Sequence, residues 1–388
     1  MDGELYRPLG MTSGARQKRR AAPLADSWRL VGVAGLVAAA SLWAALAGQP
    51  ARRVVDQLAP RSAPTASNPT STATTVPDSK VAQSRLPPVT RTGGPTIIGP
   101  SSPSGPVTFR VEDAVSLRQA PSMAHMPDPG LLEDTEFGQL PVRGADGRRP
   151  FDVYAGTWSG KPATRIAIIV GGIGISQTSS MAAVDTLPRG VTLAFAPTGN
   201  SLDRWMQAAR RGGHELLLQA PLEPIGYPQV DPGADTLTVK AASENDFAAL
   251  YAAMGRITNY VGVMNYMGGR FTADPAAMQP LISELGRRGL MYLDDASSSR
   301  SVAKDTAALE KVPYAGANVL LDAAQDPNEI KKQLDVLERV ARGQGQAIGV
   351  ASAFEGSIRT IAAWIPEAEK RGIEIVPVTA LASDPEDR

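Results

Sequence analysis

Eight short apolar runs, separated by helix-like stretches, constrain the fold of this chain more than any other feature of its sequence. They are rich in β-branched and aliphatic residues and lie at 165–170, 191–197, 215–221, 261–266, 290–295, 317–322, 347–352 and 373–378. Strands that alternate with helices form a parallel sheet whose faces the helices cover. Eight such units within about 215 residues favour a closed or nearly closed (β/α) barrel over an open doubly wound sheet. The sequence therefore predicts an α/β fold of the barrel type.

Residues typical of helix ends separate several of these runs. Asp274-Pro275 and Asp326-Pro327 each place an N-cap side chain before a proline in the first turn of a helix. Gly343 stands where the helix before the seventh run is expected to end. These signals support the alternation of strands and helices.

The beginning of the chain indicates a membrane anchor. Residues 30–51 carry no charge and just reach the length of about 20 apolar residues that a helix needs to cross a bilayer. Arg16, Lys18, Arg19, Arg20 and Arg29 precede them. Because basic flanks stay inside, we expect a cytoplasmic N-terminus at 1–29 and a single-pass transmembrane signal-anchor at 30–51 in the cytoplasmic membrane. The C-terminal domain would then lie in the periplasm or otherwise outside the membrane.

A cleaved signal peptide is the alternative interpretation of this segment. Ala45-Leu46-Ala47 resembles the small-residue pattern of a cleavage site. The long polar region before the apolar run and the length of that run favour the uncleaved anchor. Both interpretations export the C-terminal domain.

Two further segments precede the predicted barrel. Residues 52–105 are rich in Pro, Ser and Thr, a composition that buries too little apolar surface to offset the entropy of ordering. We expect a disordered linker there that acts as a tether. Residues 106–162 mix short apolar runs with Pro and Gly and predict an irregular arm. The folded domain is then expected at 163–383.

Composition excludes several classes of function. Lys+Arg 39 equals Asp+Glu 39, so the net charge gives no electrostatic case for nucleic-acid binding. Cys is 0, which excludes disulfides, thiolate metal sites and cysteine nucleophiles. Residues 171–174 follow the first strand with three glycines, but their spacing does not fit G-x-G-x-x-G, and Pro197-Thr198 offers no acidic partner for a ribose. We therefore expect neither a nucleic acid nor a nucleotide as partner.

The candidate site residues lie at the carboxyl ends of the predicted strands, where parallel α/β folds bind their ligands. No catalytic residue is assigned, and the candidates for that role are Glu223, Tyr266 and Asp294. The candidates for substrate binding are Gly171, Gly172, Gln219, Asn265, Arg270, Asp295 and Ser352. Because successive strand residues point to opposite faces, at most one of Asp294 and Asp295 is expected to face the site.

These strand-end segments resemble the divergent polysaccharide deacetylase family, a branch of the carbohydrate-esterase deacetylases. The similarity covers 165–381 in order and is carried by RIAIIVGGIG, VTLAFAPTGNSLDRWMQAARRGGHELLLQAPLEP, GVMNYMGGRFTADPAAM, RRGLMYLDDASSSRSVA and RGIEIVPVTAL. The resemblance implies an irregular (β/α) barrel and a role in carbohydrate metabolism. In metal-using relatives it implies an adjacent Asp pair at the end of strand one and His residues at the ends of other strands. Together these hold a divalent metal that activates water against an N-acetyl or ester carbonyl.

The chain departs from this pattern at the metal-binding positions. Gly171-Gly172 replaces the Asp pair, and Ala351 falls where a last-strand His is expected. Gln219 and Tyr266 stand where the family pattern commonly has His. The expected Asp pair and His ligands are therefore absent, and whether the chain is an enzyme is left open by its residues.

The two histidines of the chain cannot replace these ligands. His125 lies outside the predicted domain, and His214 precedes the third strand at the opposite end of the barrel. A catalytic zinc ion needs three His or carboxylate ligands and one open position. We therefore expect no His-based metal site and no cofactor. A hard cation such as Mg²⁺ or Ca²⁺, held by Asp294, Glu223 and carbonyl oxygens, is the alternative that remains.

Three hypotheses for function follow. The first is a membrane-anchored, envelope-side deacetylase-like protein that binds a glycan, with weak or no metal-dependent hydrolysis. The second is an active hydrolase of acetyl groups on an envelope polysaccharide, with Asp294 or Glu223 as base and Tyr266 or Arg270 stabilising the oxyanion. The third is a non-enzymatic protein that binds envelope partners through residues 106–162.

Overall fold

The structure is a computed structural model that describes residues 117–386. The predicted cytoplasmic segment 1–29, transmembrane helix 30–51 and linker 52–105 lie outside the described residues, as do residues 106–116 of the predicted arm. Between residues 117 and 386, no helix combines the length and the apolar character that a bilayer-spanning helix needs.

A nine-stranded sheet forms the centre of the domain, and all of its strand pairs are parallel. Its order is β8-β7-β6-β5-β4-β3-β10-β9, and β11 also pairs with β3. The strands are β3 (Thr164–Ile173), β4 (Thr192–Phe195), β5 (Leu216–Leu222), β6 (Gly262–Met267), β7 (Met291–Asp294), β8 (Tyr314–Gly316), β9 (Val319–Leu320), β10 (Gln346–Ser352) and β11 (Ile373–Ile375).

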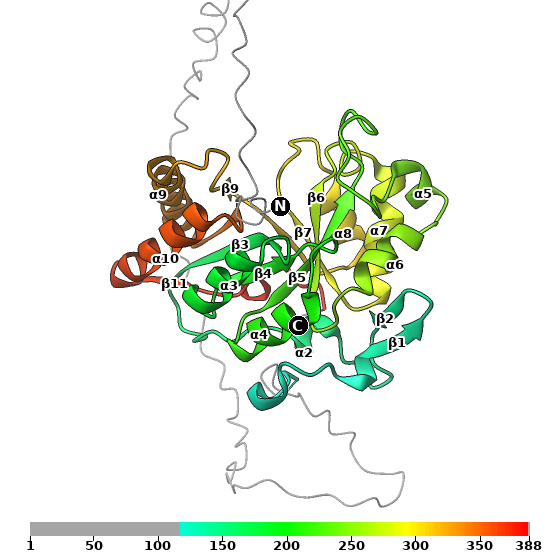
Figure 1. The fold of residues 1–388 in the computed structure, drawn as a ribbon, viewed down its shortest axis with the longest axis horizontal. Coiled ribbons are helices and arrows are strands. Elements are labelled where there is room, and N and C mark those ends of the chain that lie inside the picture. The colour runs from blue at the N-terminus through cyan, green and yellow to red at the C-terminus, as the bar shows by residue number, and fades with distance from the viewer. Residues whose placement is uncertain (1–116, 387–388) are drawn as a thin grey trace, which may run out of the picture. The chain divides into compact units, whose positions relative to one another are not determined.

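The sheet curls until its two edges meet. Its edge strands β8 and β9 are separated in the chain by only Ala317 and Asn318. The amide of Ala317 donates to the carbonyl of Asp294 in β7 at 2.8 Å. The amide of Asn318 donates to the carbonyl of Ile348 in β10, also at 2.8 Å. This confirms the predicted α/β fold as a curled parallel sheet (Figure 1).

The prediction of one strand at 317–322 was wrong in detail. Two shorter strands replace it: β8 at Tyr314–Gly316 precedes the predicted range, and β9 at Val319–Leu320 lies within it. The chain shifts between its two neighbours at Ala317-Asn318, so the first strand pairs with β7 and the second with β10. A run of apolar letters cannot show such a change of partner.

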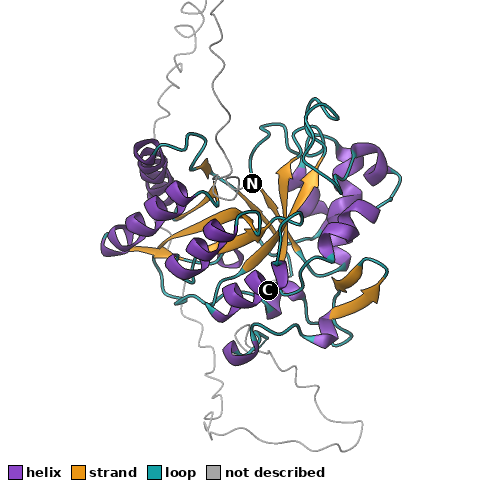
Figure 2. Cartoon of the chain, viewed as in Figure 1, coloured by secondary structure: helices purple, strands orange, loops and turns teal. Residues whose placement is uncertain are grey.

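Helices cover the outside of the curl (Figure 2). They are α3 (Gln177–Thr186), α4 (Leu202–Arg211), α5 (Val239–Ser243), α6 (Ala248–Met254), α7 (Pro275–Arg287), α8 (Ala303–Glu310), α9 (Pro327–Gln344) and α10 (Glu355–Lys370). The predicted caps of α7 and α9 are confirmed, because Asp274 accepts from the amide of Ala276 and Asp326 from that of Asn328, each at 2.9 Å. The predicted end of α9 at Gly343 was wrong by two residues, since Gly345 is the cap.

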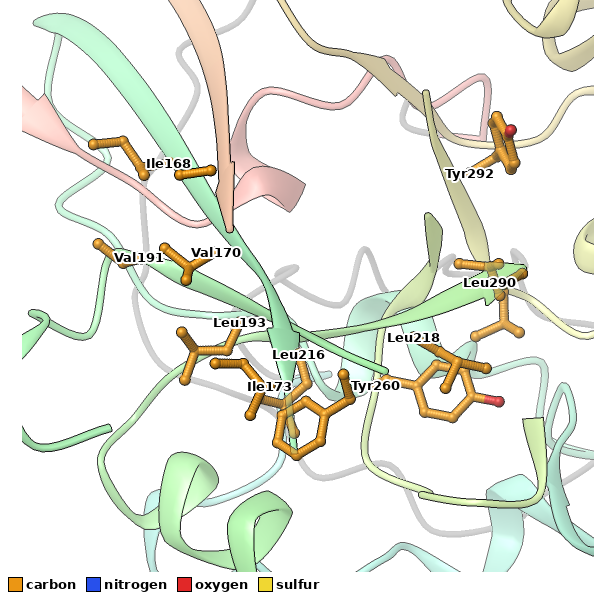
Figure 3. Close-up of a cluster of buried hydrophobic side chains, with 14 of the residues drawn as sticks. Ile168, Val170, Ile173, Val191, Leu193, Leu216, Leu218, Tyr260, Leu290 and Tyr292 are labelled. Carbon is orange, nitrogen blue, oxygen red and sulfur yellow. The ribbon is translucent and has the colours of Figure 1, made fainter. Parts of the chain in front are cut away.

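Strand residues alternate between two apolar layers, as the two-residue period of a strand requires. On β3, Ile166, Ile168 and Val170 face the helices and join the larger cluster, part of which Figure 3 shows. Ala167 and Ile169 face the inside of the curl and join a smaller cluster. The inside of the curl is therefore packed with side chains at this level.

Residues 117–162 of the predicted arm pack against the amino end of the curl. They form two short 3₁₀ turns, η3 (Pro121–Met123) and η4 (Pro129–Leu131), the hairpin β1 (Leu132–Thr135) and β2 (Gly138–Pro141), and the helix α2 (Pro150–Val153). Leu131, Phe151, Val153 and Tyr154 are buried in the inner cluster. These large apolar side chains close the amino end and are not available to a partner protein.

Buried charged groups fasten this end. The Glu215 carboxylate is fully buried and accepts from the amide of Gly156 at 2.8 Å and from the amide of Thr379 at 3.1 Å. Burial raises the pKa of Glu215, while these hydrogen bonds oppose that rise. The buried Arg210 guanidinium donates to the carbonyls of Ala124, Tyr154 and His214. Glu215 and Arg210 thus connect the arm, the strands and the C-terminal segment.

Candidate functional site

The structure brings all of the predicted site residues to one end of the curled sheet, which we call the carboxyl-end site. They lie in or directly after the last residues of β3, β5, β6, β7 and β10. The strand register supports this grouping, because Ser352 pairs with Gly171, and Tyr266 pairs with Pro221 of β5, two residues beyond Gln219. The members are Gly171, Gly172, Gln219, Glu223, Asn265, Tyr266, Arg270, Asp294, Asp295 and Ser352.

Gln219 fills the space above the glycine pair at the end of β3. Its Oε1 accepts from the amide of Gly172 at 2.6 Å, and its side chain is 7% exposed. A Cβ on Gly171 would lie only 2.7 Å from Nε2 of Gln219. Gly172 itself has φ +83°, a conformation that other residues rarely adopt. The place of the family's Asp pair therefore has no room for a carboxylate while Gln219 holds this position.

The residues at this end do not fit a divalent metal. The inner part of the site carries two glycines and an amide at Gln219, and its exposed part carries a phenol at Tyr266. In residues 117–386, no three His, Cys, Asp or Glu side chains are grouped so that they could hold a metal ion. His214 lies at the amino end, where its Nδ1 contacts the carbonyl of Val191 at 2.9 Å, and His125 lies in the arm.

Asn265 and Asp295 form a bridge between the ends of β6 and β7. Nδ2 of Asn265 donates to Oδ1 of Asp295 at 2.6 Å, and the amide of Asp295 donates to Oδ1 of Asn265 at 3.0 Å. Met267 and Ala296, next to the two ends of this bridge, both have φ +59°. Non-glycine residues in that conformation cost free energy and persist where the surrounding contacts hold them. The bridge therefore fixes two strained loops.

Asp295 is a titratable group of the site whose pKa is shifted by its surroundings. Burial raises the pKa of its carboxyl, the hydrogen bonds from Ser297 and Asn265 lower it, and the nearby charge of Asp294 adds to the rise. Both of the hydrogen bonds it accepts within residues 117–386 go to Oδ1. Its other oxygen keeps its hydrogen-bonding capacity.

The two carboxylates predicted as bases are instead engaged in the loops. Asp294 is 5% exposed and accepts from the amide of Ala296 at 2.9 Å and from the hydroxyl of Ser301. Glu223 is 5% exposed, pairs with Arg270 at 2.6 Å and accepts from the amide of Val239 at 2.7 Å. These contacts use the same oxygens that a proton transfer or a cation would need.

Asp322 ends the sixth predicted run but was not among the predicted site residues, and it positions one of them. Oδ2 of Asp322 accepts from the amide of Ser352 at 2.8 Å and from the hydroxyl of Ser357 at 2.7 Å. Its place at the end of the sixth run was visible in the sequence, but the backbone amide that it binds was not.

The groups that face solvent are those that a ligand can contact. Tyr266 is 41% exposed, and the Arg270 side chain keeps donors beyond the one that meets Glu223. The Ser352 hydroxyl makes no hydrogen bond within the described part of the chain. Exposed Ile175 and Phe354 follow β3 and β10 and add apolar surface around these polar groups. Such a surface suits a neutral ligand that offers both hydroxyl groups and apolar faces.

Comparison with known proteins places the chain in a family. The model of a family described as divergent polysaccharide deacetylase matches residues 168–382. An uncharacterized protein of Haemophilus influenzae is 26% identical over 202 residues, which is 52% of this chain and 71% of the relative. The uncharacterized protein YibQ of Escherichia coli is 22% identical over 224 residues, 58% of this chain and 69% of the relative.

A solved structure is also similar. The crystal structure of an uncharacterized protein from Agrobacterium tumefaciens shares 55% sequence identity with a TM-score of 0.62. The alignment covers 63% of this chain and 99% of that chain.

Proposed function

The chain belongs to the divergent polysaccharide deacetylase family, and from this premise we propose that it binds a glycan on the envelope side of the cytoplasmic membrane, with weak or no metal-dependent hydrolysis. Residues 30–51 would anchor it in the membrane, and the domain would act in the periplasm or otherwise outside that membrane. Its partner would be an envelope glycan, and it would bind that glycan without a cofactor.

One observation carries the proposal: Gln219 occupies the space that a metal-binding carboxylate at position 171 would need. A water-activating metal requires several ligands around one open position. The site instead offers a phenol at Tyr266, a hydroxyl at Ser352 and a guanidinium at Arg270. These groups can donate to or accept from sugar hydroxyls, and the aromatic ring can pack against the C–H face of a sugar ring.

Binding and hydrolysis are separated by one experiment on the full-length chain in detergent. Metals are removed, Zn²⁺, Co²⁺ or Mg²⁺ is added back, and acetate release is measured on acetylated chito-oligosaccharides and on acetylated xylan. Titration calorimetry measures binding of the same glycans. We expect binding without metal-stimulated release. Acetate release that depends on an added metal would overturn the proposal.

A variant locates the binding to this site. Tyr266→Ala removes the exposed ring, and we expect the dissociation constant to rise about tenfold, which corresponds to roughly 1.4 kcal/mol. Met181→Ala removes another exposed large side chain, on α3, and is the matched control. Equal affinities for the two variants would place the glycan elsewhere.

A hydrolase that needs no metal is the second candidate, and the environment of Asp295 is what favours it. A carboxylate whose pKa burial raises is a stronger base toward an attacking water than an exposed carboxylate is. Asp295 would take that proton as the water oxygen bonds to the acetyl carbon, and Arg270 would stabilise the resulting oxyanion. Asp295 would then return the proton to the sugar nitrogen or oxygen as its bond to the acetyl carbon breaks and acetate is released. Metal-independent acetate release that Asp295→Asn abolishes would establish this alternative.

A further inference from the structure

A pocket at the amino end of the sheet, far along the strands from the carboxyl-end site, has the composition of a sugar-binding site. It has a volume of about 380 Å³, within the range of small-ligand sites. Its walls come from the segments just before β3 and β4, from the end of α10 and from β11, and α10 lies beside both α3 and β11 (Figure 1). We call it the amino-end pocket; its lining residues are Thr157, Trp158, Ser159, Pro188, Arg189, Gly190, Glu369, Glu374 and Ile375.

The apolar part of the pocket is held rigidly. Trp158 is half-buried and packs against the inner cluster, and the centre of its ring lies 5.3 Å from the guanidinium carbon of Arg165. Ile375 and Pro188 add aliphatic surface. A Cβ on Gly190 would lie 2.4 Å from the carbonyl oxygen of Ile375, so the two walls are in close contact. An indole fixed in this way can receive the C–H face of a pyranose ring without further ordering.

One side of the pocket is fixed by a bidentate contact. The amide of Ser159 donates to Oε1 of Glu374 at 2.8 Å, and its hydroxyl donates to Oε2 at 3.0 Å. These bonds set the position of the segment that carries Trp158 relative to β11. The carboxylate of Glu374 is thereby occupied within the protein.

Other polar groups of the pocket are not used within the described structure. Between residues 117 and 386, the Arg189 guanidinium and the Glu369 carboxylate form no hydrogen bond or ion pair, and the indole N–H of Trp158 has no acceptor. Both charged side chains are exposed. A planar guanidinium and a carboxylate can each bind two neighbouring hydroxyl groups, and their opposite charges disfavour a strongly charged ligand.

We propose that the amino-end pocket is a second glycan-binding site, which takes one pyranose ring of a neutral oligosaccharide. The sugar ring stacks on Trp158, and its hydroxyl groups bind Arg189 and Glu369. This site shares no residue with the carboxyl-end site. Two sites on one domain would let a single long glycan be held at two points, which raises its apparent affinity without new contacts at either one.

The test uses titration calorimetry of the full-length chain with N-acetylchitotetraose and with xylotetraose as probes. Arg189→Ala combined with Glu369→Ala removes both unused charged groups and leaves the core untouched. We expect this variant to lose one of two binding sites, or its affinity there to fall at least tenfold. Lys332→Ala with Glu329→Ala, an exposed pair on α9, is the matched control and should bind as the unmodified chain does.

Tryptophan fluorescence gives a second readout. Sugar binding should change the emission of the chain, and Trp158→Phe should remove most of that change, while Trp364→Phe, which alters a buried ring on α10, should not. Unchanged binding and emission in the Arg189/Glu369 and Trp158 variants would overturn the proposal, as would the absence of binding to both probes. A peptide with the sequence of residues 52–105 that binds this pocket, when neither sugar does, would also overturn the proposal.

The result is separable from the proposed function. Loss of binding in Tyr266→Ala alone would leave only the carboxyl-end site and would overturn the second site. Loss in the Arg189/Glu369 variant alone would support the amino-end pocket and count against the proposed role of Tyr266.

Discussion

Glu215 and Arg210 at the amino end of the curled sheet differ in their surroundings from Asp295 and Arg270 at its carboxyl end. At the amino end, Glu215 is 0% exposed and Arg210 is 6% exposed, and hydrogen bonds from the arm and the C-terminal segment surround them. At the carboxyl end, the Arg270 side chain is 60% exposed, and one oxygen of Asp295 is unused within residues 117–386. The first group fastens the structure, and the second has capacity left for a ligand.

This difference shows that a perturbed ionisable group is a weak guide to function by itself. Burial raises the pKa of both Glu215 and Asp295. Both carboxylate oxygens of Glu215 accept hydrogen bonds, which come from Gly156, Thr192 and Thr379. In Asp295 only Oδ1 does so within residues 117–386. The hydrogen-bonding capacity that remains is therefore what separates a fastening group from a candidate for binding or catalysis.

The largest effect should come from the amino end. Glu215→Ala leaves the buried amides of Gly156 and Thr379 without an acceptor and removes the charge that faces Arg210. We expect the free energy of unfolding to fall by about 3–5 kcal/mol, measured by urea denaturation. Glu215→Gln keeps one acceptor oxygen and should lose less. A loss below about 1 kcal/mol for the alanine variant would remove the contrast between the two ends.

The next effect tests the tight space at the end of β3. Gly171→Asp with Gly172→Asp introduces a Cβ against Gln219 and a side chain at φ +83°. We expect a loss of about 2–4 kcal/mol in the free energy of unfolding and no zinc binding by calorimetry. Adding Gln219→Ala should recover part of the stability. Micromolar zinc binding by the double variant would show that the carboxyl end still accepts a metal.

A smaller effect concerns pH. Burial lowers the pKa of His214 at the amino end, and the hydrogen bond to the Val191 carbonyl opposes that change. Below the ordinary histidine pKa of about 6.5, the unfolded chain binds a proton at this residue more readily than the folded chain does. The contribution of His214 to the free energy of unfolding is therefore complete above that pH and declines as the pH falls below it. Thermal unfolding from pH 7.5 to 5 should show this decline, and His214→Gln should flatten it. An equal slope in the variant would assign the decline to other groups.

The smallest effect should come from the carboxyl end. Tyr266→Ala removes a ring that is 41% exposed and makes no hydrogen bond to the described residues through its hydroxyl. Its free energy of unfolding should stay within about 0.5 kcal/mol of the unmodified chain, while its glycan affinity falls. A large loss of stability would mean that this side chain serves the fold.

The sequence predicted the strands well because their period and their β-branched residues reflect burial directly. The run at 347–352 is β10 at Gln346–Ser352, and the run at 215–221 is β5 at Leu216–Leu222. It missed β8 at Tyr314–Gly316, because three residues with a central alanine give no periodic signal. What decides β8 is its neighbour β7, which lies 20 or more residues earlier in the chain.

The position of the site could be predicted from the sequence, but the hydrogen-bond partners of its residues could not. The rule that parallel strands end together placed Gln219, Asn265 and Asp295 at one edge, and they are there. No pattern in the sequence shows that Gln219 binds the amide of Gly172, or that Asp294 binds Ser301. A backbone amide carries no signature in the residue types, and the sequence does not show which of several hydroxyl groups a carboxylate binds. Side chains with free polar atoms and side chains that are already hydrogen-bonded therefore look alike before the structure is known.

The segment at 373–386 also has a consequence for how far the domain can be shortened. Thr379 completes the hydrogen bonds of Glu215, Asp384 pairs with Arg149 at 2.6 Å, and β11 supplies a neighbour to the first strand of the sheet. The first of these contacts joins residues 164 positions apart in the chain. A variant that lacks residues 373–386 would therefore lose all three contacts together, and buried groups at the amino end would be left without partners.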